Sequence, residues 1–67
     1  MSTPELVAIA YDELIDHRET EKAYLFVITG EEYWLPKSQV EDILETANQV
    51  IIPRWLANKK GLKSIYD

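Results

Sequence analysis

The alternation of hydrophobic and polar residues is clearest in the middle of the chain. Residues 23–29 form the run Ala-Tyr-Leu-Phe-Val-Ile-Thr, which is rich in β-branched and aromatic residues and predicts a strand with at least one buried face. A second apolar run begins at Tyr33 and stops at Pro36, whose missing N–H predicts a strand end or an edge position. Gly30 lies between the runs and can adopt the positive φ of a tight turn. The sequence therefore predicts a hairpin.

The segment 4–17, before this hairpin, is compatible with two structures. The tripeptide Thr-Pro-Glu at 3–5 is typical of a helix start, and apolar pairs then recur every four residues. Val7, Ile9 and Tyr11 also alternate, which instead favours a strand with one buried face. The residue pattern alone leaves helix and strand open.

The segment after the hairpin is ambiguous in the same way. Ser38 and Glu41 have the spacing of a capping box, and apolar residues follow at helical spacing, which supports a short helix over 39–47. The alternative is a strand over 40–45 that turns back into a second strand over 50–52. Because Val-Ile-Ile at 50–52 is a poor helix former, a strand is expected there in either case.

A final helix is predicted over 53–60. Pro53 suits the first helical position, and Gly61 suits a left-handed C-cap. The apolar side chains of this region should close one open end of the sheet: Trp55, Leu56 and Leu62. Residues 63–67 are expected to form a flexible tail.

Length and composition limit the class of protein. A chain of 67 residues makes one small domain, residues 1–67, and a domain of this size buries only about 60% of its unfolded surface, so association of copies into a homo-oligomer would help it. Cysteine is absent, which excludes disulfides and fits a reducing compartment. No apolar run approaches the about 20 residues of a membrane helix, and the first residues lack the features of a signal peptide. We expect a cytoplasmic protein that does not enter a membrane.

Charge is distributed unevenly along the chain. The formal net charge is −5, but residues 1–45 hold eleven acids and three bases, whereas residues 46–67 hold four bases and one acid. An acidic protein is a poor general binder of nucleic acid. The C-terminal excess of bases still allows a local basic patch, although an ordinary solvated surface would explain it as well.

The chain offers no complete catalytic or cofactor motif. His17 is the only histidine, so a zinc site would depend almost entirely on carboxylates. Ser38 has no histidine near it in sequence and no nucleophile elbow around it, and a capping role already explains its hydroxyl. Gly30 and Gly61 are the only glycines, too few for a phosphate loop. These absences predict a protein that is not an enzyme and needs no cofactor or metal.

Three segments carry a resemblance: Glu-Lys-Ala-Tyr-Leu-Phe-Val-Ile at 21–28, Tyr-Trp-Leu-Pro-Lys-Ser-Gln-Val at 33–40, and Ile-Ile-Pro-Arg-Trp-Leu-Ala-Asn-Lys-Lys-Gly-Leu at 51–62. In this order they resemble small proteins of unknown function encoded by bacteriophages and prophages, over roughly residues 13–62. The resemblance implies a compact barrel of short strands with a short C-terminal helix, and it favours a strand before the hairpin. The predicted fold is thus mainly β, a small SH3-like barrel, with an α+β fold as the alternative.

These features predict a binding module. The candidate partner-binding residues combine an aromatic ring with cations and polar groups: Trp34, Lys37, Ser38, Gln39, Arg54 and Lys59, with Trp55 and Lys60 as neighbours. For the two tryptophans themselves, however, the preferred interpretation is that both belong to the core, because burying such large side chains contributes much of the stability of a small domain. A second candidate surface is an acidic face that would dock on a basic protein: Asp12, Glu13, Asp16, Glu19, Glu31 and Glu32.

A protein is the preferred partner because the chain is acidic, lacks a catalytic set and belongs to a fold that exposes strand edges for β-augmentation. Such a module would modulate or inhibit host machinery if it is phage-encoded. The second hypothesis is a nucleic-acid-binding accessory protein, in which an aromatic ring stacks on bases while lysines and arginines contact phosphates.

Overall fold

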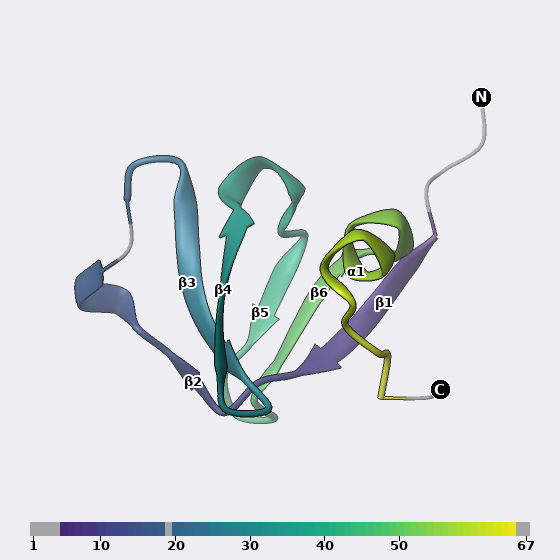
Figure 1. Cartoon of the computed structure of the whole chain (residues 1–67), viewed down its shortest axis with the longest axis horizontal. Helices are drawn as coiled ribbons and strands as arrows, with labels where there is room; N and C mark the ends of the chain where they lie inside the picture. The colour runs from purple at the N-terminus through teal and green to yellow at the C-terminus, as the bar shows by residue number, and fades with distance from the viewer. Residues whose placement is uncertain (1–4, 19, 66–67) are drawn as a thin grey trace.

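The computed structural model describes residues 5–18 and 20–65, and it is mainly β with one short C-terminal helix, as predicted (Figure 1). One antiparallel sheet has the strand order β1-β6-β5 and the other has the order β2-β3-β4. The first sheet contains β1 (Leu6–Ala10), β5 (Asp42–Leu44) and β6 (Gln49–Pro53). The second contains β2 (Glu13–Leu14), β3 (Ala23–Ile28) and β4 (Glu31–Pro36). The described helices are the 3₁₀ turns η1 (Asp16–Arg18) and η2 (Lys37–Gln39) and the α-helix α1 (Arg54–Lys60).

The N-terminal segment is a strand, so the helix alternative is wrong for the residues that the structure describes. β1 pairs with β6, with Val7 opposite Ile52 and Ile9 opposite Val50, and these four side chains are buried. The gain from pairing and burying alternate residues outweighs the local helical pattern. Most of the Thr-Pro-Glu start signal, residues 3–4, lies outside the described residues.

The predicted helix over 39–47 is also wrong, and with it the α+β alternative. The helical turn η2 ends at Gln39 and begins after Pro36 without a side-chain cap, so Ser38 does not act as a capping residue. β5 then pairs with β6, which places Ile43 opposite Val50 against the core. The hairpin turns through Asn48, which adopts a positive φ of 54°. Cross-strand burial of Ile43 replaces the predicted amphipathic face.

One bent strand connects the two sheets. The N–H of Tyr11 donates to the carbonyl oxygen of Asn48 at the end of the first sheet, and the next N–H, of Asp12, donates to Val27 in the second sheet. β1 and β2 therefore continue one another through a bend between these two residues (Figure 1). Phe26 is fully buried between the sheets, and the ring of Tyr11 meets it edge-on at 4.9 Å between centroids.

The β3–β4 hairpin forms as predicted and closes on a two-residue turn. Ile28 lies opposite Glu31, and the intervening Thr29 and Gly30 have positive φ values of 54° and 80°, which is a type I′ turn. The carboxylate of Asp12 accepts a hydrogen bond of 3.0 Å from the N–H of Gly30. One residue of the predicted acidic face thus holds the hairpin turn against the bend.

The last helix caps the sheets on one side. α1 ends at Gly61, whose φ is 74° and whose N–H donates to the carbonyl oxygens of Ala57 and Asn58. Leu56 and Leu62 are buried as predicted. Of the predicted flexible tail, residues 63–65 are described and lie against β1, because Ser64 is buried and the N–H of Ile65 donates to Ala8. Residues 66–67 lie outside the described residues.

We expect Asp12→Ala to lower the free energy of unfolding by about 1 kcal/mol, because it removes the acceptor of the Gly30 N–H. Glu13→Ala is the matched control, since Glu13 is a neighbouring exposed acid and its substitution removes the same charge. Urea unfolding of both variants measures the difference. Equal loss in the two variants would contradict a specific role for Asp12.

Stability should fall as the pH rises above about 10, the ordinary pKa of tyrosine. Burial, with a smaller contribution from Glu45, raises the pKa of Tyr11 in the folded protein. The unfolded chain therefore loses the Tyr11 proton at a lower pH than the folded chain does. The contribution of Tyr11 to stability is fully present below the pKa of the unfolded chain, and it is lost as the pH rises through the higher pKa of the folded protein. Unfolding of Tyr11→Phe between pH 8 and 11 should show a shallower decline than wild type. Parallel declines would refute the assignment to Tyr11.

Candidate binding groove

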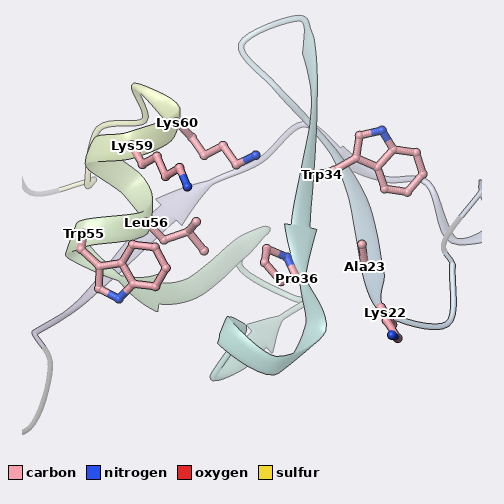
Figure 2. Close-up of a pocket in the computed structure, with 8 residues that line it drawn as sticks. All are labelled: Lys22, Ala23, Trp34, Pro36, Trp55, Leu56, Lys59 and Lys60. Atoms are coloured by element: carbon pink, nitrogen blue, oxygen red, sulfur yellow. The ribbon is translucent and has the colours of Figure 1, made fainter.

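A groove of about 360 Å³ lies between α1 and the open end of the β3–β4 hairpin (Figure 2). Its volume is at the small end of the range for ligand clefts, about 300 to 1,000 Å³. Ala23 and Pro36, which lie opposite each other in the hairpin, belong to its lining. The full lining is Lys22, Ala23, Trp34, Pro36, Trp55, Leu56, Lys59 and Lys60.

The alternation of β4 directs Trp34 out of the core. Its neighbours Tyr33 and Leu35 pack against the core between the sheets, so the residue between them must face the other side. There Trp34 lies opposite Leu25, which has no exposed surface, while the tryptophan itself remains 40% exposed. The ring thus shares the outer face of the second sheet with Leu25, and Trp34 also belongs to the groove lining.

The helical periodicity of α1 directs Trp55 outward in the same way. Leu56 and Ala57 are almost fully buried against the sheets, whereas Trp55 is 50% exposed. Lys59 follows Trp55 by four residues and so lies on the same side of the helix. In Figure 2 the side chains of Leu56, Lys59 and Lys60 extend from α1 toward β4, and Trp34 projects from β4 on the side of Ala23.

The groove is positively charged. Three of its lining residues are lysines and none of them is acidic, although the whole chain carries a net charge of −5. The two salt bridges that join described residues link Arg18 to Glu32 and Arg54 to Glu5, so neither neutralises a groove lysine. An anionic group in this groove would meet several cations and no competing carboxylate.

The structure brings together one part of the predicted binding set: Trp34, Trp55, Lys59 and Lys60. The interpretation of both tryptophans as core residues is wrong, because each is at least 40% exposed. Sequence analysis missed Lys22, which enters the groove because it directly precedes β3. Its carbonyl oxygen accepts the N–H of Lys37, so a correct hairpin register would have placed Lys22 beside Pro36.

The other predicted residues lie elsewhere. Lys37 and Ser38 line a second hollow, which shares Lys22 and Pro36 with the groove, and the Lys37 ammonium lies 4.9 Å from the centre of the Tyr24 ring. Gln39 is half-buried at the end of η2 and is not part of the groove lining. Arg54 bonds the carboxylate of Glu5, and its backbone N–H donates to the carbonyl oxygen of the same residue.

Three members of the predicted acidic face have local partners. Asp12 accepts the Gly30 N–H, Glu32 pairs with Arg18 at 3.6 Å, and Glu31 accepts the hydroxyl of Tyr33 at 2.9 Å. The last contact raises the pKa of Tyr33, since the hydrogen bond to Glu31 favours the protonated phenol. Two others, Glu13 and Asp16, are exposed, and Glu19 lies outside the described residues.

Within the described part of the chain, His, Cys, Asp and Glu side chains nowhere gather in a group of three or more that could hold a metal ion. His17 is exposed on η1. No helix among the described residues has the length and apolar character needed to cross a membrane. Comparisons of the chain with protein-family models, with curated proteins and with solved structures gave no match.

Substitution of the two neighbours on α1 should separate binding from folding. Trp55→Ala is expected to change the free energy of unfolding by less than about 1 kcal/mol, because half of this side chain is in water. Leu56→Ala should cost about 2 to 5 kcal/mol, because it leaves a cavity under the helix. Urea unfolding of the two variants measures both values. A large loss for Trp55→Ala would make this residue structural and remove it from the site.

Proposed function

We propose that the protein is a non-enzymatic binding module that docks on another protein through the groove between α1 and β4. The observation that supports this proposal is the exposure of two tryptophans in one groove together with three lysines. Tryptophan is among the residues that contribute most to binding energy in protein interfaces. The partner segment therefore combines apolar side chains, for Trp34 and Trp55, with carboxylates for the lysines.

The charge outside the groove supports a protein partner over a nucleic acid. The chain as a whole carries a net charge of −5, so a phosphate backbone that extended beyond the groove would approach carboxylates. A short acidic segment of a protein can end within the groove. The surface then attracts a small anionic group and repels a long anionic polymer.

Single-stranded nucleic acid is the second candidate, and a specific observation favours it. Lysine is depleted in the buried centre of protein interfaces, whereas aromatic rings beside cations are the usual platform for bases and phosphates. Lys22, Lys59 and Lys60 line the same groove as the two tryptophans. The two hypotheses differ in their dependence on salt.

We further propose an SH3-like relationship for the fold and a bacterial host protein as the partner. The bent strand that belongs to both sheets supports partial closure into a barrel. The resemblance of the segments at 21–28, 33–40 and 51–62 to phage proteins supports a host partner, which would be met in the host cytoplasm. Binding would then modulate or inhibit the machinery to which that partner belongs.

The first test selects short random peptides, displayed on a carrier, for binding to the protein. We expect acidic peptides with aromatic or aliphatic residues, because these complement the groove. Lys59→Glu should weaken a selected peptide at least about tenfold, which corresponds to about 1.4 kcal/mol. Lys63→Glu makes the same charge change at an exposed residue outside the groove and should leave the affinity within about twofold.

Oligothymidine provides the other arm, measured by fluorescence anisotropy at about 50 and about 200 mM salt. We expect weak binding or none. Tight binding that falls steeply with salt and is lost in Lys59→Glu but retained in Lys63→Glu would replace the protein partner with single-stranded nucleic acid. Ligands of both kinds that bind Lys59→Glu as well as wild type would refute the groove as the site.

A further inference from the structure

The strand β4 lies at the edge of the second sheet, and alternate backbone groups along it face away from β3. Among the described strands β4 pairs with β3 alone. In a hairpin closed by a two-residue turn, the pair that flanks the turn is hydrogen-bonded, and such pairs then alternate along the strands. From Ile28 opposite Glu31, this rule makes Tyr33 and Leu35 hydrogen-bonded positions and directs the backbone groups of Glu32, Trp34 and Pro36 away from β3.

Three backbone contacts confirm this alternation. The N–H of Lys37 donates to Lys22 at 2.8 Å, which continues the hydrogen-bonded series beyond Pro36. On β3, the carbonyl oxygens of Val27 and Leu25 accept hydrogen bonds from Asp12 and Ile15, on the side away from β4. Val27 and Leu25 lie opposite Glu32 and Trp34, so the backbone groups of all four residues face away from the partner strand of the hairpin.

The outward-facing groups of β4 lie beside the groove. Trp34 and Pro36 belong to its lining, and α1 supplies the residues of the opposite wall. In Figure 2 β3 lies on one side of β4 and α1 on the other, and Figure 1 shows β5 and β6 on the α1 side as well. The groove is therefore a slot between a strand edge and a helix, a shape that suits an extended peptide more closely than a compact ligand.

We propose that the partner segment binds in this slot as an added β-strand on the edge of β4. This inference rests on the proposed function and specifies how it is carried out. The N–H and C=O of Glu32 and Trp34 and the C=O of Pro36 form the hydrogen bonds to the peptide backbone. Pro36 has no N–H to offer, so the ladder ends beside it.

The charges along the slot define the peptide further. Lys22 directly precedes Ala23, which lies opposite Pro36, and Lys59 and Lys60 line the same groove from α1. Glu31 and Glu32 lie at the other end of β4, beside the hairpin turn. Acidic residues of the peptide therefore belong beside Pro36, and the other end of the peptide is neutral or basic. Between the ends, an apolar side chain contacts Trp34. The occupant is thus an extended segment of another protein with its acidic residues at one end.

The test uses a peptide from the displayed selection and amide hydrogen exchange of the protein measured by NMR. Peptide binding should slow exchange of the Glu32 and Trp34 amides at least about tenfold, because each gains a backbone acceptor. Tyr33 and Leu35 are internal controls, since their N–H groups already face β3. Their exchange should change far less.

Backbone methylation of the same peptide gives a second, independent result. Two versions of the peptide carry N-methyl groups on alternate residues, one on the odd and one on the even positions. The version whose methylated amides would face β4 should lose affinity at least about tenfold, and the other version should lose little. Equal effects in both versions, with unchanged exchange at Glu32 and Trp34, would overturn strand addition. If Lys59→Glu still weakened that peptide, the proposed function would stand and only its mode would be wrong.

Other occupants would give different results. Protection of Glu32 and Trp34 that rises with protein concentration in the absence of peptide, together with dimers in sedimentation, would assign the edge to a second copy of the chain and overturn a partner segment. Oligothymidine that binds through Lys59 while no displayed peptide is selected would overturn both the inference and the protein partner.

Discussion

The bend between Tyr11 and Asp12 is the constraint on which the rest of the structure depends. Two consecutive N–H groups donate to different sheets, one to Asn48 and the next to Val27. The inner faces of the sheets are thereby turned toward each other around Phe26. The Tyr11 ring meets Phe26, and the Asp12 carboxylate holds the β3–β4 turn. The same two residues thus fix the core, the connection between the sheets and the hairpin that forms one side of the groove.

The size of this core explains why the tryptophans lie outside it. The described core is filled by Phe26, Tyr11 and branched aliphatic side chains, with Leu56 and Leu62 covering one side. Strand alternation directs Tyr33 and Leu35 inward, so Trp34 faces outward between them, and helical periodicity separates Trp55 from Leu56 in the same way. A small domain that exposes two of its largest apolar side chains in one groove forgoes stabilisation there, and such exposure is typical of a binding surface.

Local patterns were sufficient to predict the β3–β4 hairpin, β6 and α1. Their signals are short-range: dense β-branched runs, Gly30 in a turn, Pro53 before a helix and Gly61 after it. The ambiguous segments were decided by strand pairing, which a local helical pattern does not reveal. β1 pairs with β6 across about forty residues, and β5 pairs with β6 in a hairpin that places Ile43 opposite Val50. A capping-box spacing at Ser38 carries no information about these contacts.

The binding residues were predictable only in part, for the same reason. Trp34, Lys59 and the neighbouring Trp55 and Lys60 were recognised by residue type, but their exposure depends on alternation within elements whose packing partners were unknown. Lys22 lines the groove because the hairpin register places it beside Pro36. Arg54 does not line the groove and instead bonds the carboxylate of Glu5, which is 49 positions away in sequence. Residue type therefore indicated the chemistry of the site, whereas strand register and helix packing determined which residues line the groove.

Pro36 connects the architecture of the groove with the specificity of the proposed binding. It ends β4, lines the groove, and occupies a position where the backbone faces the open edge, so the group that it lacks is an outward-facing N–H. Edge strands with a long row of unpaired groups invite indiscriminate pairing, and proline or charge limits it. Here Pro36 limits the edge at one end and the Glu31–Glu32 pair at the other, which leaves a short length of backbone beside Trp34. A partner must then match both the short ladder and the lysines around it, so the same features that protect β4 from aggregation make the slot selective.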